Sequence, residues 1–391
     1  MRIGAGRNRT QQRRSGYQPW HKMQDLAREH HIVAYSSNYT YYGDMSRRVM
    51  TVLAQYSPDQ EVYSVDECFL DLTRQPHIDL TVMGQSIRQR VKQWVGLPVS
   101  VGAGQSKTLA KLANHVAKKR AEWNGVCDLA TLNADAALAL LRTIGVRDVW
   151  GVGRKIEERL VMQGIVTAAD LRATDPAIIR RNFSVVLERT VRELNGVSCI
   201  ALEDAPPDKQ QIIASRSFGA PVYELAELAE PVRAYMTRAA EKLRRQNSVA
   251  GAVGVWIETN RFRDQDVQHH PSATVRLPES TADTLHLVHT AIGILRRIFR
   301  TGHRYVKAGV MLTDIRPAGL QQGSLFAGAG ESMEKRARLM TVLDTAAAKW
   351  GHGAIAPGTA GFSAPRAWAM KRAAMSPAYT TRWSDLLRVF T

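Results

Sequence analysis

Two adjacent acids interrupt an apolar strand pattern in the segment YSVDECFLDLT, residues 63–73. Neighbouring side chains on a regular strand point to opposite faces, so Asp66 and Glu67 converge only if the chain bends between them. Converging carboxylates at a hairpin tip offer the oxygen ligands that Mg²⁺ prefers, and two such ions align a hydroxyl nucleophile with a triphosphate. The alternative is a solvated turn, but the apolar residues on both sides favour a place on a sheet. We expect Asp71 to end a strand rather than to bind metal.

A second candidate group lies in SVGAGQSKTLAKLAN, residues 100–114, where a strand pattern passes through glycines into a helix. Ser106 is the expected N-cap, which places Lys107 in the first turn, where helix N–H groups attract phosphate. Lys111 follows four residues later and shares the same helix face. The spacing is not that of a P-loop, and lysines on a helix are often only solvated. The motif therefore gains meaning only beside the carboxylates.

A third candidate is Trp150-Gly-Val-Gly153, which separates two helical patterns. It resembles a helix-hairpin-helix, in which glycines allow backbone N–H groups to approach a DNA phosphate. Arg154 and Lys155 follow directly and would add positive charge. The alternative is an ordinary helix–helix turn in which Gly151 and Gly153 serve backbone geometry alone.

The charge of the whole chain favours a polyanionic partner. Its 391 residues carry 53 Lys and Arg against 36 Asp and Glu, a net charge of +17 that is spread along the sequence. A nucleic acid is the expected partner. The three cysteines are far apart and argue against a disulfide framework or a zinc site. No segment approaches the ~20 apolar residues of a membrane span or resembles a signal peptide, so we expect a cytoplasmic protein without a membrane partner.

The elements that position these residues fall into successive regions. Residues 1–15 lack apolar periodicity and are expected to form an unpacked basic arm. Residues 16–133 alternate helical and strand patterns, including a helix over 80–95, which indicates an α+β region around a sheet. Residues 134–203 are largely helical, and the proline-containing stretch at 204–213 is expected to be a linker.

The second half of the chain begins with a recognisable element order. Residues 214–316 read strand, helix, strand, strand, helix, strand, the βαββαβ order of a split-βαβ domain. Ser280 with Asp283 is expected to cap the second of these helices. Residues 317–391 are expected to be a C-terminal tail. Within it, Gln322-Gly-Ser-Leu-Phe326 is either a short linear motif that fits a partner's groove or ordinary tail sequence.

Taken together and in this order, these segments resemble the UmuC-type branch of the Y-family DNA polymerases. The resemblance runs from about Gly16 to the C-terminus. It is carried by SSNYTYYGDMSRRVM, YSVDECFLDLT, VGAGQSKTLAKLANHVAKK, VWGVGRKIEERL with NFSVVLERTVREL, SRSFG, GHRYVKAGVML and MKRAAMSPAYTTRWSDLLRV. It implies a right-hand-like, multidomain α+β polymerase with partial fingers and palm at 16–133, a helix-hairpin-helix thumb at 134–203 and a little finger at 214–316.

The resemblance also implies a function, an error-prone translesion polymerase that copies damaged templates during SOS mutagenesis. Asp66 and Glu67 match the family's second catalytic acidic pair, which would hold two Mg²⁺ ions. Lys107 matches the lysine near the incoming triphosphate, and Lys111 would assist it. The residues expected to contact DNA are Gly151, Gly153, Arg154, Lys155 and, in the little finger, Arg216.

The partners that the resemblance implies are primer–template DNA, deoxynucleoside triphosphates, a UmuD′-like dimer, a sliding clamp and a recombinase filament. The tail motif resembles the family's clamp-binding motif, with Gly323 in place of the usual leucine. Its expected clamp-binding residues are Gln322, Ser324, Leu325 and Phe326.

The sequence departs from the family pattern at its start. Family members open with a strand bearing Asp-x-Asn-x-Phe-Tyr, which supplies another metal-binding aspartate, and this sequence contains neither that strand nor the Asn-Asn-Asp-Gly segment that follows it. Because two-metal chemistry needs closely placed oxygen ligands, an alternative stays open: a catalytically inactive DNA-binding or regulatory remnant.

Overall fold

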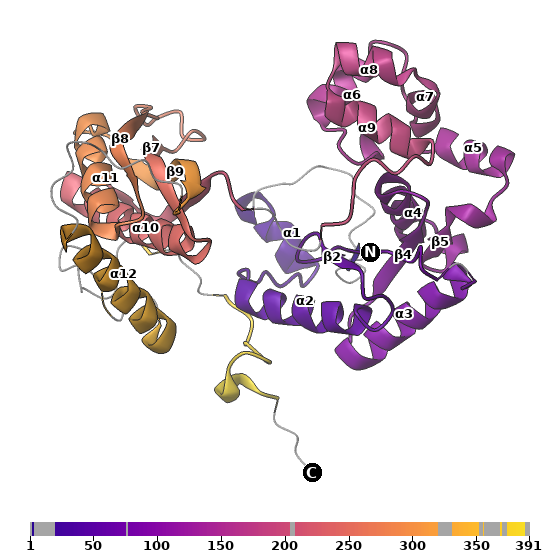
Figure 1. Cartoon of the computed structure of the whole chain (residues 1–391), viewed down its shortest axis with the longest axis horizontal. Helices are drawn as coiled ribbons and strands as arrows, with labels where there is room; N and C mark the ends of the chain where they lie inside the picture. The colour runs from indigo at the N-terminus through magenta and orange to yellow at the C-terminus, as the bar shows by residue number, and fades with distance from the viewer. Residues whose placement is uncertain are drawn as a thin grey trace. The chain divides into compact units, whose positions relative to one another are not determined.

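The chain folds into two compact units, which the computed structural model describes over residues 2–3, 20–75, 77–203, 208–319, 331–351, 355, 368–369 and 374–387. The first unit comprises residues 1–206 together with 374–391, and the second comprises residues 207–373 (Figure 1). The boundary falls inside the stretch that the sequence predicted as a linker. The chain therefore leaves the first unit once and returns to it near its C-terminus.

The first half of the first unit combines helices with two small sheets. Its helices are α1 (Gln24–Glu29), α2 (Tyr39–Leu53), α3 (Leu80–Val95) and α4 (Lys107–Lys119). Its strands are β1 (Arg2–Ile3), β2 (Gln60–Val62), β3 (Cys68–Leu70), β4 (Val99–Ala103) and β5 (Val126–Asp128). One sheet has the order β1-β4-β5, and β2 and β3 form a hairpin. The predicted α+β organisation is confirmed.

The strand β1 corrects one expectation. Arg2 and Ile3 pair antiparallel with β4, so these two residues are not part of an unpacked arm. Residues 4–19 lie outside the described part of the chain.

Helix α3 shows why this part of the fold was predictable. Asp79 caps it by accepting hydrogen bonds from the N–H groups of Thr81 and Val82. Gly96 ends it in the left-handed conformation, with φ of 78°. Between these signals Ile87 and Val91 recur at helical spacing and are buried in the core that α2 and β4 share.

The helical region of the first unit follows β5. Its helices are α5 (Ala134–Arg142), α6 (Arg154–Val161), α7 (Ala168–Ala173), α8 (Pro176–Asn182) and α9 (Val185–Leu194), with a short 3₁₀ turn at Val146–Asp148. Leu112 and Val116 of α4 belong to the same hydrophobic core as Leu160 and Leu187 of this region. The predicted helical region is thus present, and it packs against the helix that carries the two candidate lysines (Figure 1).

The second unit has the predicted βαββαβ order. Its elements are β6 (Ile212–Val222), α10 (Leu225–Arg245), β7 (Ser248–Thr259), β8 (Ser272–Thr281), α11 (Thr284–Ile298), β9 (Tyr305–Pro317) and α12 (Glu331–Trp350). The strands form one antiparallel sheet in the order β6-β9-β7-β8. Side chains of α10 and α11 form the core with one face of this sheet.

Two local expectations for this unit were wrong. Strand β6 begins at Ile212, so the last residues of the predicted linker already belong to the sheet. Asp283 alone caps α11, by accepting from the N–H groups of Leu285 and His286, while Ser280 lies in β8. A single carboxylate two and three residues ahead of those N–H groups satisfies them without a capping box.

The predicted tail is also folded where the structure describes it. Helix α12 packs on the second unit, where Arg244 donates two hydrogen bonds, of 2.7 and 2.6 Å, to the carboxylate of Asp344. Residues 374–387, here called the C-terminal segment, belong to the first unit. The candidate clamp motif at 322–326 lies outside the described residues.

The C-terminal segment contacts the start of α2. The N–H of Ser36 donates to the carbonyl of Ala374 at 2.7 Å, and the Asn38 side chain donates to the carbonyl of Ser376 at 3.3 Å. The rings of Tyr41 and Tyr379 meet edge to face with centroids 6.0 Å apart. These contacts join two segments of the family resemblance that lie more than 300 residues apart in the chain.

Across the described residues, no helix is long and apolar enough to cross a membrane.

Candidate active site and nucleic-acid interface

The two predicted acids lie at the tip of the β2–β3 hairpin, in what we call the acidic bend (residues 64–67). The N–H groups of Tyr63 and Ser64 both donate to the carbonyl of Glu67 at 3.1 Å, which closes the bend. The hydroxyl of Ser64 donates to the carboxylate of Asp66 at 2.7 Å. The predicted bend is confirmed, and Asp71 follows the end of β3 as expected.

Lys111 of α4 lies against the acidic bend. Its Nζ is 3.2 Å from a carboxylate oxygen of Glu67, and the two side chains are 14% and 13% exposed. Charges that are this poorly solvated interact more strongly than a surface pair does. The structure therefore brings one predicted lysine and one predicted carboxylate into direct contact.

Two aromatic rings complete the surroundings of Lys111. Its Nζ lies 4.3 Å from the ring centroid of Tyr63 and 4.7 Å from that of Trp150. The indole N–H of Trp150 donates to the hydroxyl of Tyr63 at 3.3 Å. Sequence reasoning did not assign either ring to the site, because Tyr63 and Trp150 are 87 residues apart in the chain.

Lys107 is in a different environment, one turn earlier on α4. Its ammonium donates to the buried carboxylate of Glu61 and, at 2.6 Å, to the carbonyl of Ala201. The Lys107 and Glu61 side chains are only 7% and 9% exposed. Glu61 also accepts from the N–H of Glu203 at 2.8 Å, so this ion pair anchors the segment from which the chain passes into the second unit.

A second buried carboxylate occupies the N-terminus of α4. Glu193, which is fully buried, accepts from the N–H and the hydroxyl of Thr108 at 2.9 and 2.7 Å. It also accepts from the N–H groups of Cys199 and Ile200 at 3.1 and 3.0 Å. Ser106 caps the helix as predicted, by accepting from the N–H of Leu109. An internal anion thus uses the helix N-terminus that the sequence suggested for phosphate.

The acidic bend fits a magnesium site. Mg²⁺ is commonly held by one or two carboxylates, with water and substrate phosphates filling its other positions. Asp66 is exposed, and the carboxylate of the next residue, Glu67, lies 3.2 Å from the ammonium of Lys111. These two carboxylates are the candidate metal ligands of the bend. Within the described ranges no group of three or more His, Cys, Asp or Glu side chains gathers at metal-binding distance.

The glycine turn between the helical elements is exposed. Gly151 has a φ of +90°, a conformation that favours glycine, and Gly153 precedes the first residue of α6. Arg154 and Lys155 begin α6 and are exposed, with Arg154 2.9 Å from Glu158. The four residues that the sequence predicted for a DNA phosphate are therefore together at one surface turn.

Arg216 lies on the covered face of its sheet. Ile212 and Phe218 pack with the core, and Arg216 shares their strand parity. Arg216 lies near Tyr235 of α10, which covers this face. Burial raises the pKa of Tyr235 to about 12, and the positive charge of Arg216 opposes that rise. The exposed residues of β6 in this stretch are Ser215 and Ser217 instead. A DNA contact by Arg216 stays a prediction, and it would have to be made around the edge of β6.

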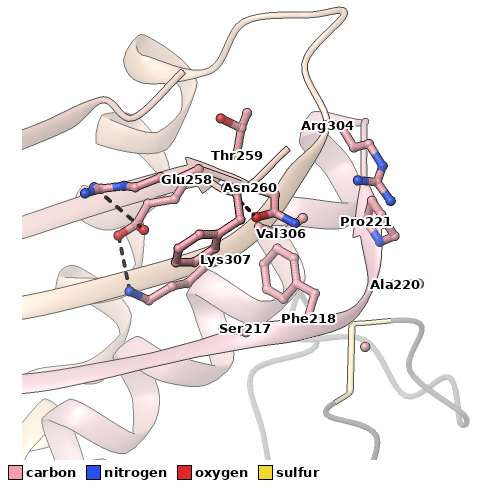
Figure 2. A pocket seen from close by; sticks show the side chains of 13 residues that line it. Ser217, Phe218, Ala220, Pro221, Glu258, Thr259, Asn260, Arg304, Val306 and Lys307 are labelled. Atoms are coloured by element: carbon pink, nitrogen blue, oxygen red, sulfur yellow. Dashed lines mark hydrogen bonds and ion pairs between the residues drawn. The ribbon is translucent and has the colours of Figure 1, made fainter. Parts of the chain in front are cut away.

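The second unit also has a cavity of about 540 Å³ where β6, β7 and β9 meet. Figure 2 shows the ring of Phe218 and the ion pair of Glu258 with Lys307 among its lining side chains. The Nζ of Lys307 is 3.2 Å from a carboxylate oxygen of Glu258. Phe262, on the loop that follows β7, is 95% exposed. Ser217, Phe218, Arg304, Val306 and Lys307 of this cavity lie in segments that carry the family resemblance, but the sequence did not predict a site there.

The profile of the impB/mucB/samB family matches residues 13–115, that of the impB/mucB/samB family C-terminal domain matches 209–325, and a domain of unknown function matches 337–389. The chain is 46% identical over 374 residues to protein UmuC of Salmonella typhimurium, covering 95% of this chain and 87% of that protein. It is 41% identical over 374 residues to protein SamB of Salmonella typhimurium, covering 94% and 86%.

One solved structure supports the fold. A Y-family DNA polymerase chimera, Dbh-Dpo4(243-245)-Dbh, superposes with a TM-score of 0.59 and covers 77% of this chain and 84% of its own. The sequences are 18% identical, so this likeness concerns the fold alone. The multidomain α+β architecture expected from the sequence is confirmed.

Proposed function

This chain belongs to the UmuC-type branch of the Y-family DNA polymerases, the impB/mucB/samB family, and we propose that it is the catalytic subunit of an error-prone DNA polymerase. The substrates are primer–template DNA and deoxynucleoside triphosphates. The observation that carries the proposal is the acidic bend, where Asp66 and Glu67 lie together and Lys111 is 3.2 Å from Glu67. We further propose that the template is damaged DNA and that the setting is the SOS response, because the chain resembles UmuC-type polymerases over most of its length.

Asp66 and Glu67 are the residues that would hold Mg²⁺, with two ions expected as in other polymerases of this type. When bound, Mg²⁺ offsets the charge of the triphosphate and lowers the pKa of the attacking 3′-hydroxyl. The hairpin contributes fixed geometry, because Ser64 orients the carboxylate of Asp66 and the backbone bonds of the bend hold Glu67. The 3′-hydroxyl of the primer would lose its proton to solvent as its oxygen attacks the α-phosphorus, and pyrophosphate would leave with the electrons of the broken P–O bond.

Lys111 is the cation that we assign to the triphosphate. It lies at the acidic bend, and a lysine ammonium neutralises charge on the phosphates as pyrophosphate departs. A phosphate contact by Lys107 stays a prediction. The Lys107 ammonium is buried and already donates to Glu61 and to the carbonyl of Ala201. For Lys107 we favour a structural role at the segment from which the chain passes into the second unit.

Duplex DNA would be bound by the exposed glycine turn. Gly151 and Gly153 are exposed, so a phosphate could approach the backbone closely there, and Arg154 and Lys155 add two positive charges. This surface would position the duplex without reading its sequence, as a translesion polymerase requires when its template bases are altered.

The implied protein partners are a UmuD′-like dimer, a sliding clamp and a recombinase filament. We propose that the clamp binds through Gln322, Ser324, Leu325 and Phe326, as a short motif with two apolar anchors. Replacing Leu325 and Phe326 by alanine should remove clamp binding on a sensor surface and leave primer–template binding unchanged. Clamp binding that survives the double substitution would move the contact elsewhere.

Primer extension tests the proposed function. The chain, with Mg²⁺, all four deoxynucleoside triphosphates, UmuD′ and the clamp, should extend a primer on an undamaged template and past a single abasic site. Extension that stops at the abasic site would remove the translesion part of the proposal. DNA binding without extension on either template would favour the alternative of a non-catalytic DNA-binding protein.

A further inference from the structure

We propose that Trp150 is a positioning residue of the active site, which together with Tyr63 holds the ammonium of Lys111 in place before a triphosphate arrives. We call Tyr63 and Trp150 the aromatic pair. The inference rests on the proposed function, in that Lys111 must serve the triphosphate. It adds a residue of the helical region to a site that is otherwise built from the hairpin and α4.

The ammonium of Lys111 is surrounded by two rings and a carboxylate. Its Nζ lies 4.3 Å from the ring centroid of Tyr63, 4.7 Å from that of Trp150 and 3.2 Å from Glu67. An ammonium is attracted by the electron-rich face of an aromatic ring, most strongly by an indole. Because the lysine is only 14% exposed, water competes weakly with these contacts. Lys111 is thus held on several sides at once.

Trp150 itself is held in place by its neighbours in the fold. Its chain neighbours Val149 and Val152 are buried in the core of the helical region, and Gly151 turns the chain with a φ of +90°. Its N–H donates to the hydroxyl of Tyr63 at 3.3 Å. Its ring meets the Tyr63 ring at 89° with centroids 5.6 Å apart, and lies 6.1 Å from that of Phe69. The indole therefore fastens the glycine turn to the acidic bend.

The aromatic pair reduces the entropy that Lys111 loses when a nucleotide binds. A free lysine side chain loses substantial conformational entropy when it is fixed against a ligand. The aromatic pair removes much of that freedom during folding, so less is lost when the triphosphate binds. Loss of Trp150 should weaken nucleotide binding and leave duplex binding intact.

A double-mutant cycle tests whether Trp150 acts through Lys111. The dissociation constant of the correct deoxynucleotide is measured on a complex with a dideoxy-terminated primer, so that no turnover occurs. We expect Trp150→Ala and Lys111→Ala each to raise it on the order of tenfold, as for loss of a desolvated cation–π contact. The double variant should be no worse than Lys111→Ala. If the double variant raises the dissociation constant by the product of the two single effects, the inference is overturned.

A spectroscopic readout follows the ammonium directly. Reductive ¹³C-methylation keeps the lysine charge, and the methyl signal of Lys111, assigned with Lys111→Arg, should be displaced by the ring currents of the aromatic pair. Trp150→Phe, which keeps a ring but not the N–H, should reduce the displacement, and Trp150→Ala should reduce it further. Should Trp150→Ala not fold, Trp150→Phe alone decides the matter. A signal that does not respond would contradict the inference.

Trp94→Ala is the matched control, because the ring of Trp94 on α3 also lies against a cation, with 5.4 Å between its centroid and the guanidinium carbon of Arg90. It should change neither readout. Failure of the proposed function gives a different result: Lys111→Ala would then leave nucleotide binding unchanged. An effect of Lys111→Ala that Trp150→Ala neither shares nor modifies would leave the function standing and sink this inference.

Discussion

Lys107 donates to the buried carboxylate of Glu61, whereas Lys111, one turn further along α4, lies 3.2 Å from Glu67 at the acidic bend. The two lysines share a helix face and were predicted to share a ligand. Their partners differ, because Lys107 joins an internal ion pair and Lys111 lies at the edge of the candidate site.

Lys107→Ala should destabilise the first unit by about 3–5 kcal/mol, because it leaves the Glu61 carboxylate buried and unpaired. Urea unfolding measures this loss. Lys119→Ala on the same helix is the control, since Lys119 is 62% exposed and lies 3.7 Å from Asp148, and its loss should cost less than about 1 kcal/mol. Adding Glu61→Gln to Lys107→Ala should restore part of the stability. Equal costs for the two lysines would contradict the structural role of Lys107.

Gly151→Ala and Gly153→Ala should separate folding from DNA binding. Gly151 has a φ of +90°, so alanine there should cost about 1–2 kcal/mol of stability. A side-chain carbon at Gly153 meets nothing within 4 Å, so alanine there should leave stability unchanged within about 0.5 kcal/mol. If Gly153 approaches a phosphate, its alanine variant should nevertheless bind duplex DNA more weakly. Unchanged DNA affinity would make this an ordinary helix turn.

Arg154→Ala and Lys155→Ala should each weaken binding to all duplex sequences alike. Removing one phosphate contact should reduce the slope of log affinity against log salt concentration by about 0.9. Fluorescence anisotropy over a salt series measures the slope. Arg181→Ala, an exposed arginine at the end of α8, is the control and should leave it unchanged. A change confined to one DNA sequence would argue against a phosphate contact.

Tyr379→Ala should loosen the start of α2, because the contact of this ring with Tyr41 is lost. An aromatic pair is worth about 1 kcal/mol, which corresponds to roughly fivefold faster amide exchange in the first turn of α2. Hydrogen exchange with mass spectrometry measures the rate. Trp383→Ala removes a 90% exposed ring of the same segment and should have no effect. Similar effects of both variants would contradict a specific contact.

The elements with local signals were predictable, and the partners of the site were not. Helix α3 has the predicted bounds because Asp79, Gly96 and the helical spacing of apolar residues all lie within it. The partners of Lys107 and Lys111 come from residues 46 and 44 positions earlier in the chain, so only the fold reveals them. The same holds for the pairing of Ser36 with Met375.

The sheet face on which Arg216 lies had a signal in the sequence. Ile212, Ala214 and Phe218 alternate along β6, and this parity assigns Arg216 to the apolar side of the strand. The folding of α12 onto the second unit was harder to foresee, because it depends on the pairing of Arg244 with Asp344 across 100 residues.

The second unit should lose stability in mild acid through His269. Burial, and then the positive charges of His303, Arg300 and His270, lower the pKa of His269, whose Nδ1 lies 2.7 Å from the hydroxyl of Tyr305. A depressed folded pKa means that the unfolded chain takes up the proton first, so stability is complete above about pH 6.5 and falls below it.

Unfolding of the full chain at about pH 7.5 and about pH 5.5 measures this loss. His269→Gln, which keeps a polar partner for Tyr305, should lose less stability between the two than the parent chain. His289→Gln, at an exposed position on α11, should lose as much as the parent. Indistinguishable pH dependences for all of them would show that His269 does not contribute.

The central claim, that the acidic bend is the catalytic site, is tested most directly by Asp66→Ala. The variant and the parent chain are compared in primer extension with Mg²⁺ and in binding of the same primer–template without nucleotide. Because Asp66 would contact metal and not DNA, we predict that synthesis is lost by at least about a thousandfold while DNA affinity stays within about twofold. Synthesis that survives the substitution, or DNA binding that is lost with it, would contradict the assignment.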